Sequence, residues 1–132
     1  MSENKSSVRK TVIVVIGAGG DRDVSKRPEM GEVAARLADL AVLTSDNPRS
    51  EDPVAIIDAI RSGMPADAAV AVEPDRATAI AVALAEARAG DVVVIAGKGH
   101  EAVQVVGDQA LAFDDRTVAR DALRALRGSR AW

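Results

Sequence analysis

The sequence predicts an α/β domain of the Rossmann-like, three-layer type, in which helices cover both faces of a mostly parallel sheet. Three observations favour this class. Short β-branched runs alternate with segments of helical apolar spacing, polar loops follow two of those runs, and 132 residues suffice for one domain with a buried core. Such alternation is typical of parallel sheets, because each crossover between parallel strands needs a connection long enough to contain a helix.

The first half of the chain is expected to contain two strand–helix units. Residues 11–16 are β-branched and end in a glycine-rich loop, which predicts a buried strand. A helix is predicted over residues 29–40, with its apolar face formed by Met30, Val33, Ala34, Leu37 and Ala38. A short strand over 41–44 then leads to a polar loop, and Pro53 begins a helix that ends near Arg61.

The second half continues the same alternation. Residues 69–72 are predicted to form a strand, and Asp75 caps an alanine-rich helix that is expected to end at Gly90. Residues 91–96 predict a further strand. The alanine-rich helix carries no chemistry, so we interpret it as a packing element.

A hairpin and a last helix complete the prediction. Residues 103–106 and 110–113 read as its two strands around a Gly-Asp turn, and Asp114 or Asp115 caps a helix to about Arg127. No internal repeat or low-complexity linker is evident. The expected organisation is a polar tail, one domain and a short second tail, over residues 1–10, 11–127 and 128–132.

Composition narrows the function classes. Hydrophobic residues make up 48% and charged residues 28%, with a net charge of −3, so nothing favours nucleic acid or an anionic membrane surface. One Phe and one Trp leave little for bases to stack on, and the absence of Cys excludes disulfides and thiolate metal sites. The apolar run after the basic start is too short for a secretory signal or a membrane span, so we expect a cytoplasmic protein.

Two polar loops carry most of the chemical information. Asp46-Asn47-Pro48-Arg49 follows one predicted strand, and Gly97-Lys98-Gly99-His100-Glu101 follows another. Ligand groups in open α/β sheets gather at the carboxyl ends of strands, so the two loops are expected to face one crevice. A planar cation (Arg49), an amide (Asn47), a carboxylate (Glu101) and bare glycine backbone suit a small zwitterion with amino and carboxylate groups.

Familiar motifs do not fit these loops. The glycine-rich loop 17–22 has Arg22 where a dinucleotide fingerprint requires Gly or Ala. The loop at 96–99 has Gly99 where a Walker loop needs Ser or Thr for Mg²⁺. His100 is the only histidine, so no metal site and no catalytic triad is predicted.

Structural alternatives exist for each polar group. The first loop is also compatible with an Asx-turn in which Arg49 is solvated or paired with Glu51. The glycines of the second loop are also compatible with a simple change from strand to loop. His100 is compatible with a structural role, residues 21–23 with a surface ion-pair cluster, and Lys26-Arg27 with solvated basic residues before a helix.

Four motifs in order carry a resemblance that covers nearly the whole chain. They are G-A-G-G-D-R-D-V-S-K-R-P, T-S-D-N-P-R-S-E-D-P, D-R-A-T-A-I and G-D-V-V-V-I-A-G-K-G-H-E. Together they resemble the C-terminal domain of the Mur ligases, and among these the UDP-N-acetylmuramoyl-tripeptide synthetases. The Asp-Asn-Pro-Arg form of the second motif goes in that family with meso-diaminopimelate as substrate.

The resemblance implies a substrate-binding role for five residues: Arg22, Asn47, Arg49, Gly97 and Glu101. Arg49 and Asn47 would hold the remote carboxylate of meso-diaminopimelate, Glu101 and the Gly97 carbonyl its remote ammonium, and Arg22 the other carboxylate. The neighbours of these residues would shape the loops or support the contacts from behind: Asp21, Asp46, Lys98 and His100. No residue is assigned a catalytic role.

The resemblance also implies what surrounds the domain. A complete ligase of this family binds ATP and Mg²⁺ in a central domain and the uridine nucleotide in an N-terminal domain, and neither is recognisable here. The strand and helix that open the family's C-terminal domain are also not recognisable. We therefore expect the isolated chain to be inactive, with a separate chain as one source of the other domains. The alternative is a non-catalytic module that binds diaminopimelate or docks on another ligase.

Overall fold

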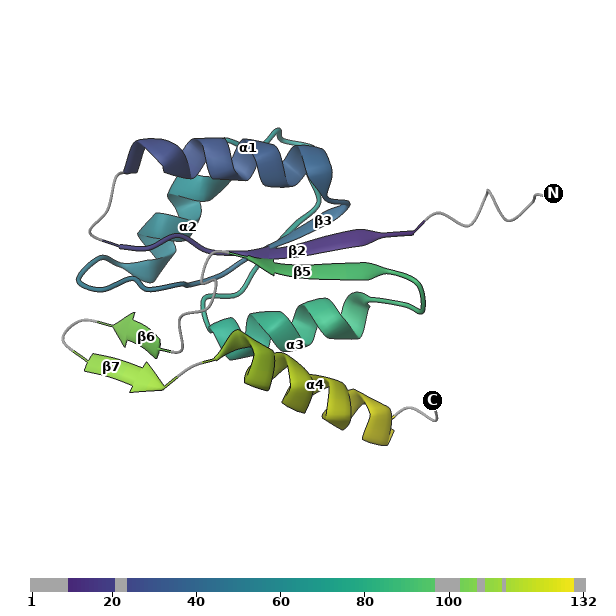
Figure 1. Ribbon diagram of the computed structural model, residues 1–132. Coiled ribbons are helices and arrows are strands. Elements are labelled where there is room, and N and C mark those ends of the chain that lie inside the picture. The colour runs from purple at the N-terminus through teal and green to yellow at the C-terminus, as the bar shows by residue number, and fades with distance from the viewer. Residues whose placement is uncertain (1–9, 21–23, 97–102, 107–108, 113, 130–132) are drawn as a thin grey trace.

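The computed structural model describes residues 10–20, 24–96, 103–106, 109–112 and 114–129. These residues form three layers, with a parallel sheet between two pairs of helices (Figure 1). Helices α1 and α2 cover one face, and α3 covers the other with α4 packed against it (Figure 1). The predicted α/β class is therefore confirmed.

The sheet contains four strands in the order β4-β3-β2-β5, and all neighbouring pairs are parallel. They span β2 (Val12–Ile16), β3 (Leu40–Leu43), β4 (Val70–Val72) and β5 (Val92–Ala96). In β2, Ile13 is paired with Leu40 of β3 on one side and with Val93 of β5 on the other. Because all four run the same way, their carboxyl ends meet at one edge, where the predicted loops begin.

Three of the four helices in the described part of the chain begin at the positions that the sequence predicts, whereas α1 begins at Arg27, two residues before the predicted Glu29. The helices are α1 (Arg27–Leu37) after a short 3-10 turn at Val24–Lys26, α2 (Pro53–Arg61), α3 (Arg76–Glu86) and α4 (Asp115–Ser129). Asp52 caps α2 by accepting from the Val54 amide at 3.0 Å, and Asp75 caps α3 by accepting from the Thr78 amide at 3.0 Å. The predicted bounds of α2 are confirmed at both ends.

Two helices end earlier than predicted. Helix α1 ends at Leu37, because Asp39 already joins the sheet: its amide donates to the Val12 carbonyl and its carboxylate accepts from the Val12 amide, both at 2.8 Å. Helix α3 ends at Glu86, because the following residues form a turn toward β5 in which Gly90 adopts a φ of +91°. Pairing with β2 therefore ends α1, and the turn into β5 ends α3, where helical spacing alone predicts longer helices.

The predicted hairpin is confirmed outside the main sheet. Strands β6 (Val103–Val106) and β7 (Gln109–Ala112) are antiparallel, with Val103 opposite Ala112. The second strand begins one residue earlier than the sequence predicts. Asp114 then accepts from the Arg116 amide at 2.9 Å and from the Val118 amide through its carbonyl at 3.0 Å, which begins α4.

Alternate residues of each strand supply two separate cores. On one face, Ala41 and Leu43 pack with Ile56, Ile57 and Ile60 of α2. On the other face a second set is packed against α3, consisting of Ile13, Val15, Val42, Ala79, Ile80 and Ala83. Burial of both faces explains why the strands read as continuous apolar runs rather than as alternating ones.

The predicted apolar face of α1 exists, but part of it is exposed to solvent. It lines an open groove of about 470 Å³ between the helix and the strands β2 and β5. Leu37 is 70% exposed and Val94 of β5 is 44% exposed. Within this face, Ala34 is buried in the core and Met30 packs against it, and Gly31 is buried beside them.

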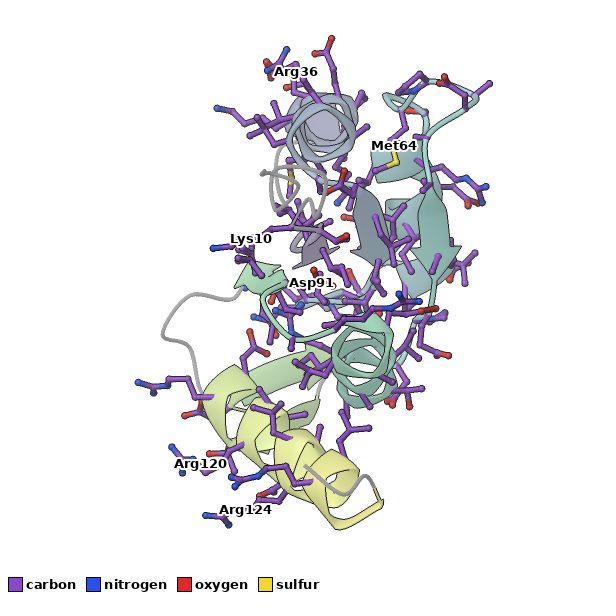
Figure 2. The ribbon with its side chains drawn as sticks, turned by 90° about the vertical axis from the view of Figure 1, so that its right-hand side faces the viewer. Lys10, Arg36, Met64, Asp91, Arg120 and Arg124 are labelled. Atoms are coloured by element: carbon purple, nitrogen blue, oxygen red, sulfur yellow. The ribbon has the colours of Figure 1, made fainter. Side chains whose placement is uncertain are left out.

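At the amino edge of the sheet, a second carboxylate besides that of Asp39 accepts hydrogen bonds from backbone amides of two segments. Asp91 accepts from the amides of Arg88 and Thr11, both at 2.9 Å. Figure 2 looks toward this edge and shows Lys10 and Asp91 there, while Arg120 and Arg124 on α4 point away from the rest of the molecule. Among the described residues, no helix has the length and apolarity needed to cross a membrane.

Candidate substrate-binding site

Three loops leave the carboxyl edge of the sheet next to one another. They follow β2, β3 and β5, which are adjacent or separated by a single strand. Two of them, residues 17–20 and 44–52, lie within the described part of the chain, and the third begins directly after Ala96. This edge is where parallel sheets place their ligand sites.

The loops after β2 and β3 are in direct backbone contact. The Gly20 amide donates to the Asn47 carbonyl at 2.6 Å. A Cβ atom on Gly20 would lie 1.8 Å from the Pro48 carbonyl oxygen, and one on Gly17 would lie 2.6 Å from the Thr44 oxygen. Glycine is therefore required at both positions, because any side chain would push the loops apart.

Arg49 lies at the junction of these two loops. Its Nη1 donates to the Gly20 carbonyl at 3.1 Å and to the Asn47 carbonyl at 3.2 Å. Its backbone has a φ of 53°, which is left-handed and unusual for a residue other than glycine. Strained backbone of this kind clusters at ligand sites, where the surroundings hold it in place.

The guanidinium of Arg49 still has donors to offer. Within the described part of the chain, only Nη1 makes hydrogen bonds, and the residue is half-buried. Asp46 and Asn47 are different, because they are 6% and 2% exposed and lie inside the loop. Of the described candidates, Arg49 is thus the least buried, and it has guanidinium nitrogens that make no hydrogen bond to the described residues.

Two arginines that sequence reasoning did not assign to the site are buried beside it. The expectation that Arg27 is solvated is wrong: it is 4% exposed, and its Nη1 and Nη2 donate to the Glu51 carboxylate at 3.0 and 2.7 Å. Nη2 also donates to the Gly19 carbonyl at 3.1 Å. Glu51 is therefore paired with Arg27, so the alternative in which it pairs with Arg49 is not observed.

Arg76 is the second buried arginine. It is the first residue of α3, and its side chain is fully shielded from solvent. Its guanidinium forms a bidentate pair with Asp115 of α4 and also donates to the backbone carbonyls of Ser45 and Ala96. The signal for both arginines is their position, because a cation in the first turn of a helix opposes the helix dipole and so needs a partner.

The remaining predicted site residues lie outside the described residues: Asp21, Arg22, Gly97, Lys98, His100 and Glu101. Their places in the sequence are nevertheless informative. Arg22 follows Gly20 by two residues, and Gly97 follows Ala96 directly. Among the described residues, no group of three or more His, Cys, Asp or Glu side chains is arranged to hold a metal ion.

Comparison with a family model identifies similarity over most of the chain. Residues 2–99 match the model described as "Mur ligase, glutamate ligase domain". This stretch is more than half of the 132-residue chain.

Individual proteins and one solved structure agree with this match. A 2,6-diaminopimelate ligase of Synechococcus sp. (strain WH7803) is 58% identical over 89% of this chain, and one of Geobacillus kaustophilus (strain HTA426) is 54% identical over 88%. Both are named UDP-N-acetylmuramoyl-L-alanyl-D-glutamate–2,6-diaminopimelate ligase. A solved structure with the same name superposes with a TM-score of 0.85, at 41% identity over 91% of this chain. The chain spans only about a quarter of these relatives, 23%, 24% and 25% of their respective lengths.

Proposed function

Because the chain belongs to the Mur ligase family, we propose that it is the amino-acid-binding part of a ligase that adds meso-diaminopimelate to UDP-N-acetylmuramoyl-L-alanyl-D-glutamate in peptidoglycan synthesis. The observation that carries this proposal is Arg49. Its charged group stands half-buried where two strand-end loops meet, with donors left over for a ligand. The names of relatives that are more than half identical supply the substrate.

The proposed contacts follow from the chemistry of a ligand with two amino and two carboxylate groups. Arg49 binds the remote carboxylate, for which a planar guanidinium offers paired donors. Asn47 lies next to it in the loop and supports this contact. Glu101 and the Gly97 carbonyl receive the remote ammonium, and Arg22 holds the second carboxylate. These contacts leave the other amine free to form the new amide bond.

The reaction needs ATP and Mg²⁺, and the described residues of this chain do not form a binding site for either. ATP and Mg²⁺ would activate the acceptor carboxylate, yet the glycine loop after β5 has Gly99 where a Walker loop has Ser or Thr, and the described residues offer no cluster of metal ligands. We therefore assign both to the regions that the longer relatives possess in addition. The part played by this chain is to bind the amino acid and orient its amine, in the cytoplasm where the nucleotide precursor is made.

Ligand selectivity tests the proposal. Lysine lacks the remote carboxylate, so in the site it would leave Arg49 desolvated and without its anion. A site built around a polar group rejects analogues that lack it by factors of about 10⁴ or more, although an isolated domain is expected to show only part of this. Calorimetric titration of the chain with meso-diaminopimelate and with L-lysine is the measurement.

The expected result is binding of meso-diaminopimelate with at least about tenfold weaker binding of lysine. Equal affinities would contradict the assignment of Arg49 to the remote carboxylate. L-Glutamate serves as a control, since it has carboxylates at both ends but no remote ammonium, and it is expected to bind weakly as well.

A further inference from the structure

We infer that Arg76 is a positioning residue that fixes the spacing between the two loops of the proposed substrate site. The identity of the ligand rests on the proposed function, whereas the contacts of Arg76 are observed independently of it. Among the described residues, Arg76 donates to no candidate ligand-binding side chain. It acts on the backbone from which those side chains project.

The guanidinium contacts three separate segments at once. Nη1 donates to the Ser45 carbonyl at 2.9 Å, and Nη2 donates to the Ala96 carbonyl at 3.3 Å. Nε and Nη2 donate to the two carboxylate oxygens of Asp115 at 2.8 and 2.7 Å. One side chain therefore links the loop after β3, the end of β5 and the start of α4.

The two carbonyls occupy informative places in the sequence. Ser45 directly precedes Asp46 and Asn47, and Ala96 directly precedes the loop that begins at Gly97. Their strands are not neighbours, because β2 lies between β3 and β5. No sheet hydrogen bond can join the two loop bases directly, so Arg76 provides a direct link across the intervening strand.

Burial makes this link rigid and excludes a direct ligand role. The Arg76 side chain is 0% exposed and that of Asp115 is 10% exposed. Charge-assisted, bidentate hydrogen bonds in such surroundings are short and directional. Lysine cannot replace this arrangement, since a single ammonium cannot reach acceptors on three segments in the fixed geometry of a guanidinium.

The test is Arg76→Lys in the full 132-residue chain, with Ile80→Ala as the matched control. Ile80 lies one turn further along the same helix, is 0% exposed and belongs to the core cluster that contains Val15 and Val42. Three properties are measured for each variant: the melting temperature, the backbone amide resonances of residues 44–47, 49 and 97–101, and the affinity for meso-diaminopimelate at a temperature where the variants are folded.

We expect Arg76→Lys to shift amide resonances in both loops and to weaken meso-diaminopimelate binding by roughly 10- to 100-fold, as misplaced binding groups do. Ile80→Ala is expected to lower the melting temperature while leaving the loop resonances and the affinity close to those of the parent chain. Arg76→Lys with unmoved resonances in either loop would overturn the inference.

Two further outcomes are distinguished. If the parent chain does not bind meso-diaminopimelate, the proposed function fails, and the loop resonances still decide whether Arg76 positions both loops. If Arg76→Lys does not fold, Asp115→Asn replaces it, because this change keeps one acceptor for the guanidinium while removing the charge. Resonances of both loops should then move, and confinement of the changes to α4 would overturn the inference.

Discussion

Two arginines near the same sheet edge are used in opposite ways. Arg76 is fully shielded, and its described acceptors occupy Nε, Nη1 and Nη2. Arg49 is half-buried, and among the described residues only its Nη1 makes hydrogen bonds. The same type of side chain therefore links structural elements at Arg76 and has donors available for a ligand at Arg49.

The difference shows that the number of donors already satisfied is more informative than charge. An arginine with every guanidinium nitrogen bonded to a carbonyl or a carboxylate, and with a fully shielded side chain, stabilises the fold and does not contact a substrate. An arginine that is held through one nitrogen, on left-handed backbone, is fixed in place and keeps its other N–H donors available for a ligand. Removing the first should lower stability and displace the loops, and removing the second should weaken binding with little loss of stability.

The largest stability effect is expected for Arg76→Ala. The change leaves the Asp115 carboxylate and two backbone carbonyls buried without their donor, and truncating one partner of a buried pair typically costs about 3–5 kcal/mol. Urea denaturation measures the free energy of unfolding. The double variant Arg76→Ala/Asp115→Ala should recover part of the loss, because it removes the orphaned carboxylate. A loss below about 1 kcal/mol, typical of surface pairs, would remove the distinction from Arg49.

Arg49→Ala should act mainly on the ligand. Loss of the cation beside a desolvated carboxylate typically costs about 2–5 kcal/mol, or roughly 30-fold to several thousand-fold in affinity for meso-diaminopimelate. Stability should fall by only about 1 kcal/mol for the lost hydrogen bonds to carbonyls. Calorimetry and a melting curve separate the two effects, and an unchanged affinity would show that Arg49 is only a loop support.

Arg49→Gly is the matched control for backbone strain. Both variants lose the guanidinium, but glycine adopts a φ of 53° without the penalty that alanine retains. We therefore expect equal loss of affinity and a melting temperature higher for the glycine variant than for the alanine variant.

Asp91→Asn extends the comparison to the amino edge of the sheet, where the Asp91 carboxylate that accepts from the Arg88 and Thr11 amides is only partly buried. The amides of Arg88 and Thr11 hold the pKa of the Asp91 carboxyl below its usual value of 3.8. Because the folded-state pKa is the lower one, the ionised carboxylate stabilises the fold above pH 3.8, and this contribution is lost as pH falls through the folded-state pKa. The variant should melt below the parent at pH 7, with the gap narrowing in acid. Asp121→Asn on the exposed side of α4 is the control, and a pH-independent gap for Asp91→Asn would contradict this assignment.

The smallest effect is expected in the groove. Leu37 is large and apolar but 70% exposed, so Leu37→Ser should change the free energy of unfolding by no more than about 0.5 kcal/mol. The matched variant Leu43→Ala, at a position that is 0% exposed, should cost about 2–5 kcal/mol. Equal losses in denaturation experiments would mean that Leu37 is buried in solution.

The sequence was most predictive where a local signal fixes a local structure. Helix α2 was predicted to start at Pro53 and to end near Arg61, because proline is favoured in the first turn of a helix, and the structure has these bounds. For α1, periodicity correctly placed Met30, Val33 and Leu37 on one side, yet it could not say that part of this side faces a groove. Burial depends on what covers a face, and periodicity carries no information about that.

The arginines illustrate the same limit in the site. Arg49 was singled out because its loop follows a strand, and the structure places it where the loops after β2 and β3 meet. The partners of Arg27 and Arg76 lie 24 and 39 residues away in sequence, so no local pattern connects them. Only their unfavourable position at the start of a helix hinted that each had an acidic partner.

The position of β2 between β3 and β5 has a consequence for the order in which the chain can fold. Val12 is paired with Val92, so one hydrogen-bonding edge of the central strand stays open until β5 has been synthesised. Pairings this distant in sequence are slow to form, because the entropy cost of closing a long loop comes before any stabilising contact is made. On the ribosome, β2 to β4 can assemble with α1 and α2 first, which leaves an apolar strand edge exposed to other nascent chains. Pairing with β5 then covers this edge of β2.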